Sequence, residues 1–110
     1  MKKVSIVEIL RRQIPWSTRT FGEGRRTKGI TDHIAKELEE IRAEPDDLME
    51  WVDVILLGLD GAWRAGYTAS EVQEAIQAKQ RYNMDRIWPR FKGEVPDQAI
   101  EHVRPDQPTN

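Results

Sequence analysis

The segment 45–65 is the part of the chain that most constrains its fold. Read as a helix, it is apolar over well over half of its circumference, through the following residues: Leu48, Trp51, Val52, Ile55, Leu56, Leu59, Ala62 and Trp63. A helix with so wide an apolar face needs partners on more than one side. We therefore expect an all-α helical bundle that is completed by homo-oligomerisation, as a dimer or as a tetramer built from two dimers.

Apolar spacing and helix breakers predict three more helices around this segment. Their expected ranges, in chain order, are 4–14, 31–44 and, after the segment 45–65, 68–87. Pro15 should end the first helix, and residues 15–30, with three glycines and two aromatic side chains, should form an ordered loop. Pro45 suits the first turn of the third helix, and a T-x-x-E capping box at Thr68 should open the last one.

The chain of 110 residues is expected to form one small domain over 1–92, followed by a poorly ordered tail over 93–110 that is rich in Pro, Asp and Gln. The absence of cysteine excludes disulfides, thiolate catalysis and Cys-based zinc sites. No apolar run is long enough to span a membrane, and no signal-like stretch follows Met1. We expect a cytoplasmic protein without a membrane partner.

Charge is segregated along the chain although the net charge is only −2. Residues 1–30 carry eight Lys/Arg against two acids, residues 31–60 carry ten acids against two bases, and residues 61–92 carry six bases against three acids. An acidic centre between basic segments suits a cation bound to a polyanion, such as a metal ion with phosphates. Duplex binding favours an overall basic chain or face, so no nucleic-acid partner is expected.

Two short carboxylate motifs lie on either side of Pro45, an E-x-x-E at Glu37 and Glu40 and an E-x-x-D at Glu50 and Asp53. The i, i+3 spacing puts each pair on one face of a helix, so antiparallel helices would bring all four together. At about 5 Å and an effective dielectric constant near 20, each pair of negative charges costs roughly 3 kcal/mol. Something positive should therefore lie among them, and a hard divalent cation that takes oxygen ligands is the natural candidate.

Three neighbours of the quartet have open roles in the sequence. Glu39 points away from the apolar stripe of its helix, to solvent. His33 is either a ligand or supporting group of the site, or a partner in a hydrogen bond at the helix end. Asp60 lies two turns beyond Asp53, and it either extends the acidic site or pairs with Arg64 at i+4.

A basic set follows thirty residues later. Lys79, Asn83 and Arg86 have spacings of four and three and therefore align on one helix face. A cation, an amide and a planar fork donor suit phosphate oxygens and a sugar hydroxyl, although a solvated basic face has the same pattern. Trp16 is a candidate for stacking on a base, with core packing as the alternative.

Together these residues resemble the MazG-like, all-α nucleoside triphosphate pyrophosphohydrolases. Motifs of that superfamily occur in order: E-x-x-E at 37–40, E-x-x-D at 50–53, K-x-x-x-N-x-x-R-x-W-P at 79–89, and Pro15-Trp16 followed by Thr20-Phe21-Gly22. The closer resemblance is to a phage and prophage family described as dATP/dGTP diphosphohydrolase-like, which includes the MazZ type. Lys36 and Ser17 depart from the superfamily pattern, but the four acids are intact.

The resemblance implies hydrolysis of a nucleoside triphosphate, with a purine deoxynucleotide (dGTP or dATP) as the expected substrate, to the monophosphate and pyrophosphate in a host cytoplasm. It also implies Mg²⁺ or Mn²⁺ as the cofactor. The catalytic and metal-binding residues would be Glu37, Glu40, Glu50 and Asp53, with Glu40 a candidate to accept the proton of the attacking water. The substrate-binding residues would be Lys79 and Arg86 on the phosphate tail, Asn83 on the phosphate or sugar, and Trp16 at the base.

Two non-enzymatic hypotheses compete with this one. A helical module that binds nucleic acid or a protein partner would use the basic N-terminal segment, and its salt-sensitive binding would depend on Arg25, Arg26 and Lys28. A purely structural oligomeric protein would leave the acids of a largely apolar helix unexplained. Neither would show metal-dependent turnover.

Overall fold

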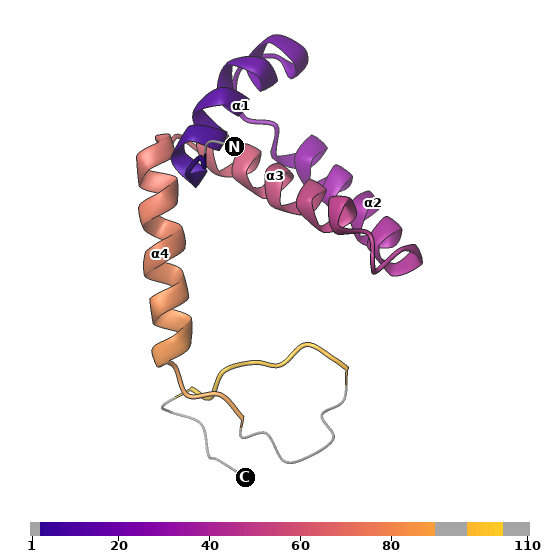
Figure 1. The fold of residues 1–110 in the computed structure, drawn as a ribbon, viewed down its shortest axis with the longest axis vertical. Coiled ribbons are helices and arrows are strands. Elements are labelled where there is room, and N and C mark those ends of the chain that lie inside the picture. Colours follow the sequence, from indigo (N-terminus) through magenta and orange to yellow (C-terminus); the bar gives the residue numbers. More distant parts are fainter. Residues whose placement is uncertain (1–2, 90–96, 105–110) are drawn as a thin grey trace. The chain divides into compact units, whose positions relative to one another are not determined.

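The computed structural model describes residues 3–89 and 97–104, and within these ranges the regular structure consists of four helices with no strand. The helices are α1 (Ile6–Phe21), α2 (Thr27–Ala43), α3 (Leu48–Arg64) and α4 (Ala69–Asp85), as Figure 1 shows. This confirms the predicted all-α class. The chain divides into two compact units, Met1–Ala75 and Ile76–Asn110.

The prediction that Pro15 ends the first helix is wrong, because Pro15 lies inside α1 and the helix continues to Phe21. A proline costs a helix one backbone hydrogen bond, so the turn that follows needs other support. Ser17 supplies it: this residue is fully buried, and its hydroxyl donates to Asp60 Oδ2 at 2.9 Å. Arg64 Nη2 in turn donates to the backbone carbonyl of Ser17 at 3.2 Å. Contacts with α3 therefore hold the C-terminal turn of α1 in place.

The ordered loop predicted over 15–30 is correspondingly shorter. Only residues 22–26 connect α1 to α2, and α2 begins at Thr27 instead of Thr31. Gly22 and Gly24 have φ values of 94° and 87°, which side chains disfavour. These two glycines let the chain reverse sharply between the helices.

The next two helix starts are set by side-chain caps. Pro45 precedes α3 instead of lying in its first turn, because Asp47 is the N-cap and its Oδ1 accepts from the Met49 amide at 3.0 Å. The capping box before α4 is confirmed: Thr68 Oγ1 accepts from the Glu71 amide at 3.1 Å, and Glu71 Oε1 accepts from the Thr68 amide at 3.0 Å. This helix ends at Asp85, two residues before the predicted end.

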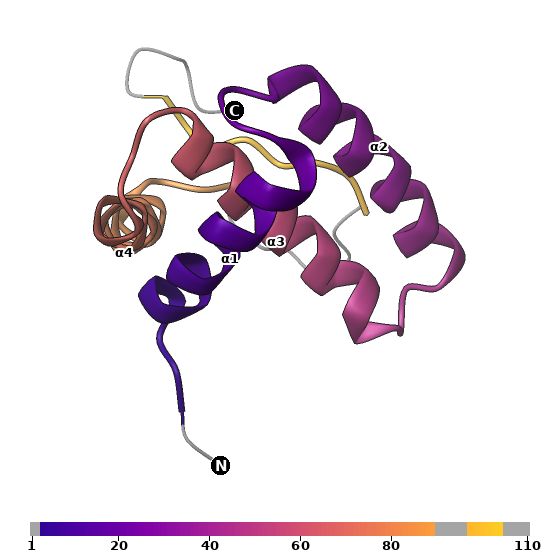
Figure 2. The ribbon, with the colours of Figure 1, turned by 90° about the horizontal axis from the view of Figure 1, so that it is seen from above.

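The first unit has a small apolar core. Leu10, Leu59, Ala69 and Val72 form it where α1, α3 and the first turn of α4 meet. Figure 1 and Figure 2 both show α2 beside α3, and a short turn over 44–47 joins these two helices. This pairing places the acidic motifs of the two helices next to each other.

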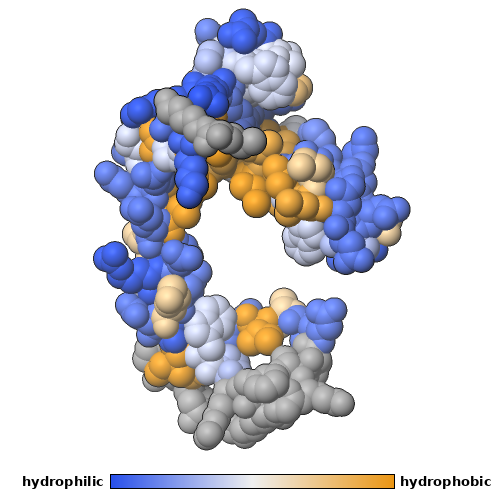
Figure 3. Space-filling model, viewed as in Figure 1, coloured by the Kyte–Doolittle hydropathy of each residue, from blue (hydrophilic) through white to orange (hydrophobic). Residues whose placement is uncertain are grey.

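Much of the apolar face of α3 is left uncovered. Four large apolar side chains of this helix are between 49 % and 67 % exposed: Leu48, Met49, Trp51 and Ile55. Hydrophobic side chains gather over α3 on the face shown in Figure 3. One chain therefore does not bury the wide apolar face, as expected for a helix that needs a second partner. The oligomeric assembly itself stays a prediction.

In the second unit, residues 97–104 carry no helix or strand. Part of this segment contacts residues just beyond α4: the Val103 amide donates to the Ile87 carbonyl at 2.6 Å. Of the tail predicted to be poorly ordered, 93–96 and 105–110 lie outside the described residues. None of the helices in the described ranges has the length and apolar character needed to cross a membrane.

Candidate metal and nucleotide site

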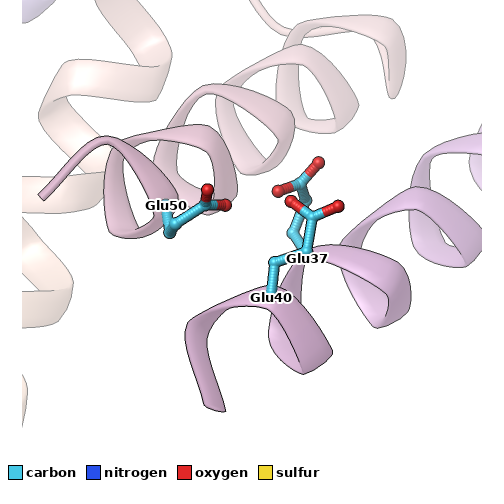
Figure 4. A group of neighbouring side chains, drawn as sticks. All are labelled: Glu37, Glu40 and Glu50. Atoms are coloured by element: carbon cyan, nitrogen blue, oxygen red, sulfur yellow. The ribbon is translucent and has the colours of Figure 1, made fainter. Parts of the chain in front are cut away.

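Three carboxylates converge between α2 and α3. Glu37 and Glu40 project from α2 and Glu50 from α3, and Figure 4 shows their carboxyl groups facing one another. One oxygen of each residue lies within 4.8 Å of the corresponding oxygens of the other two. Glu37 is buried and the other two are half-buried. Three of the four predicted metal ligands are thus brought together from two helices.

Asp53, the fourth predicted ligand, is not within that distance of all three glutamates. It lies three residues beyond Glu50 on α3, and it lines the same cavity as Glu37. A hydrogen bond to Glu40, burial, and the negative charges of Glu40 and Asp53 raise the pKa of Glu37. Asp53 therefore acts electrostatically on the cluster, and its role as a metal ligand stays a prediction.

The protonation of the cluster shows how strongly it needs a positive charge. A hydrogen bond to Glu40, burial and the Glu40 charge raise the pKa of Glu50 to about 7. Hydrogen bonds from Glu37 and Glu50 lower the pKa of Glu40. Without a metal ion, protons on Glu37 and Glu50 thus take the place of a cation around an ionised Glu40.

The donor set fits a hard divalent cation. Glu37 Oε2 and Glu50 Oε2 are buried, and neither has a hydrogen-bond partner among the described residues. Buried polar atoms are nearly always paired, so these two oxygens call for a ligand. Carboxylate oxygens are the ligands that Mg²⁺ and Mn²⁺ prefer.

Two neighbours of the cluster now have defined contacts. His33 Nε2 lies 3.1 Å from Glu37 Oε1, so the imidazole contacts a predicted metal ligand and is not occupied in a helix-end hydrogen bond. Glu39 is exposed and accepts from Arg42 Nη1 at 3.0 Å, which confirms that it points to solvent. The two acids Glu39 and Glu40, adjacent in sequence, therefore differ fully in surroundings.

A cavity of about 580 Å³ extends from the cluster between α1, α2 and α3. Its walls are mostly apolar and include the following residues: Ile9, Trp16, Phe21, Ile30, Leu56 and Leu57. Trp16 is 51 % exposed and packs edge-to-face on Phe21 with ring centroids 5.7 Å apart. Core packing, the alternative for Trp16, is thus not observed, and its ring lines a space of the size that small-molecule sites have.

Asp60 and Arg64 form a buried ion pair at the side of the cavity away from the cluster. Arg64 Nε donates to Asp60 Oδ2 at 3.1 Å, which decides between the two roles that the sequence left open for Asp60. Arg64 Nη1 also donates to the carbonyls of Gly22 and Gly24, at 2.9 and 2.8 Å. This pair therefore anchors the connection between α1 and α2 that follows Phe21.

The sequence did not single out every residue of the cavity. Gln13 and Arg12 line it from α1, and Arg26, whose guanidinium lies 5.0 Å from the centre of the Phe21 ring, lines it from the connection to α2. A signal was present: Ile9, Arg12, Gln13 and Trp16 have the spacing i, i+3, i+4, i+7 of a single helix face. It was missed because the helix was expected to end at Pro15.

The basic set lies in the second unit. Arg86 Nη1 donates to Asn83 Oδ1 at 3.2 Å, and Lys79 and Arg86 both lie over the ring of Tyr82, at 5.2 and 4.5 Å. The three side chains are thus close to one another, as their spacing predicted. Arg86 Nη2 also lies 3.0 Å from His102 Nε2. A shared site with the carboxylates stays a prediction.

Comparison with known proteins agrees with this geometry. No curated protein sequence matches the chain. A solved structure is similar: the cyanophage S-2L MazG-like pyrophosphohydrolase, bound to dGDP and three catalytic Mn²⁺ ions per active site. The match has 28 % identity and a TM-score of 0.71, and it covers 93 % of this chain and 100 % of that one. Residues 9–107 match the model of the dATP/dGTP pyrophosphohydrolase family. The chain therefore belongs to this family of hydrolases, with the MazG-like all-α fold.

Proposed function

We propose that the enzyme hydrolyses a purine deoxynucleoside triphosphate, dATP or dGTP, to the monophosphate and pyrophosphate with Mg²⁺ or Mn²⁺. The convergence of Glu37, Glu40 and Glu50, with buried oxygens that lack partners, carries this proposal. The family description names both nucleotides, and the cyanophage relative was solved with dGDP and Mn²⁺.

The carboxylates would hold the metal ions, with Asp53 as the fourth ligand beside the three that converge. Bound ions would neutralise phosphate charge and lower the pKa of the attacking water. Glu40, a half-buried carboxylate of the cluster, would accept the proton of that water. His33 would orient Glu37 through their 3.1 Å contact.

The cavity offers room for the nucleoside next to the phosphates. Asp53 and Asp60 line it seven residues apart on α3, which is about 10 Å along the helix axis. The apolar walls between them suit a sugar and a base, with Trp16 as the stacking partner. Lys79 and Arg86 would bind the phosphate tail, and Asn83 would bind a phosphate oxygen or the sugar.

The test is pyrophosphate release from dATP and dGTP with Mg²⁺ or Mn²⁺. Substitution of residues that only hydrogen-bond to metal ligands lowers metal affinity or activity by about 10–100-fold. Glu50 is itself a proposed ligand, so Glu50→Gln should lower kcat/KM by at least about 100-fold. Glu39→Gln is the matched control, since Glu39 is an exposed glutamate of α2, and it should keep wild-type activity. Circular dichroism should show equal helix content in both variants. Full activity in Glu50→Gln would refute the metal site.

A further inference from the structure

One polar side chain of the cavity wall is held in a single orientation. Gln13 Nε2 donates to the backbone carbonyl of Leu56 at 2.9 Å and to Asp60 Oδ1 at 3.3 Å. Both partners are acceptors, so the amide atom that faces α3 must be the NH₂ nitrogen. The carbonyl oxygen, Oε1, therefore makes neither of these contacts. The amide links α1 to α3, which restricts its movement further.

The partner that orients Gln13 stays ionised. Burial of Asp60 opposes ionisation, but hydrogen bonds from Trp63, Ser17, Arg64 and Gln13 outweigh it and lower the pKa of Asp60. An ionised carboxylate only accepts hydrogen bonds, so the amide of Gln13 cannot turn around without losing its partner. The side chains of Asp60 and Arg64 are 8 % and 1 % exposed, which makes this anchor rigid.

The remaining polar atom of this amide is Gln13 Oε1. Gln13 lines the cavity, and no donor among the described residues reaches this oxygen. The donors that line the cavity, among them the Trp16 indole N–H and the guanidinium groups of Arg12 and Arg26, make no hydrogen bond to this oxygen in the structure, so water is its partner until a ligand displaces it. An acceptor left unpaired in that situation costs binding free energy, so the cavity favours a ligand that brings a donor to this point.

We propose that Gln13 Oε1 is a specificity-determining acceptor that receives a hydrogen bond from an exocyclic amino group of the purine base. This role rests on the proposed function. Gln13 is anchored to Asp60, seven residues from Asp53 along α3, which places it on the nucleoside side of the metal cluster. Adenine and guanine each carry an exocyclic amino group, whereas hypoxanthine and thymine carry none.

The experiment measures kcat/KM for two substrate pairs that differ by one amino group each. The pairs are dGTP with dITP, and dATP with the 2′-deoxyribonucleoside triphosphate of unsubstituted purine. For the wild-type enzyme, the ratio of kcat/KM with the amino group to kcat/KM without it should be about ten in at least one pair, as expected for the loss of one hydrogen bond. That ratio should fall to near one in Gln13→Met, because Met keeps the size of the side chain and removes the acceptor.

Gln73→Met is the matched control. Gln73 is also a half-buried amide between helices, since its Oε1 accepts from the Val7 amide at 3.2 Å, but it does not line the cavity. Its variant should keep the wild-type ratio even if it loses some stability. The comparison separates the loss of a helix contact from the loss of the acceptor.

Wild-type ratios near one for both pairs would overturn the proposal without any variant, and a wild-type ratio near ten supports it even if Gln13→Met does not fold. A ratio unchanged in a folded Gln13→Met would also overturn it. Absence of pyrophosphate release from all four substrates would refute the proposed function instead, and turnover with ratios near one would refute the role of Gln13 alone.

Discussion

At the scale of single residues, the carboxylate cluster couples stability to pH. The pKa of Glu50 rises from 4.5 to about 7 on folding, so the folded state holds a proton that the unfolded state releases. This contribution to stability is complete below pH 4.5 and is lost as the pH rises through about 7. The raised pKa of Glu37 acts in the same direction, and the lowered pKa of Glu40 has its effect at more acidic pH.

We therefore expect the metal-free enzyme to lose thermal stability between pH 4.5 and about 7, and Glu50→Gln to lose less. The variant carries a neutral amide that mimics the protonated acid. Thermal unfolding in a chelator, followed by circular dichroism across this pH range, measures the difference. Addition of Mg²⁺ above pH 7 should restore the wild-type Tm, because the metal ion replaces the lost protons. The same dependence of Tm on pH in the two proteins would contradict the uptake of a proton by Glu50 on folding.

The buried ion pair makes a second prediction at the residue scale. Arg64→Met leaves Asp60 charged and buried, and it removes the donors to Gly22 and Gly24, so it should cost about 3–5 kcal/mol of unfolding free energy. Arg42→Met removes an exposed pair with Glu39 and should cost less than about 1 kcal/mol. Urea unfolding measures both. Equally small losses of unfolding free energy in the two variants would show that the buried pair contributes little to stability.

At the scale of elements, side-chain caps set where helices begin. Thr68 and Glu71 satisfy each other's backbone amides at the start of α4, so Thr68→Ala should cost about 1 kcal/mol. Thr68→Ser keeps the hydroxyl and should cost only a fraction of that. Urea unfolding of the two variants provides the comparison, and an equal loss in both would assign the effect to the Thr methyl group.

At the scale of the whole molecule, the uncovered face of α3 points to self-association. Ile55 is 56 % exposed in a row of large apolar side chains, so Ile55→Glu should shift a wild-type oligomer to the monomer. Ile55→Val, which keeps the face apolar, should leave the assembly intact. Size-exclusion chromatography with light scattering measures the mass of each. A monomeric wild type at micromolar concentration would refute the expected homo-oligomer.

The sequence by itself determined the features that depend on neighbours a few residues away. Helical periodicity, the capping box at Thr68 and the alignment of Glu37 with Glu40 and of Glu50 with Asp53 all follow from spacing of three or four residues. These features predicted the all-α class, whereas the family was predicted from the resemblance of its motifs, which occur in order between residues 15 and 90.

Only the tertiary structure decided what depends on distant partners. α1 continues past Pro15 because Ser17 meets Asp60 and Arg64, 43 and 47 residues further along the chain. The same packing of α1 on α3 forms one side of the cavity and turns the amide of Gln13 toward α3. Local helix propensity reflects the backbone N–H that proline lacks. It does not reflect the buried hydrogen bonds to α3 that compensate for this loss, because their partners are distant in sequence.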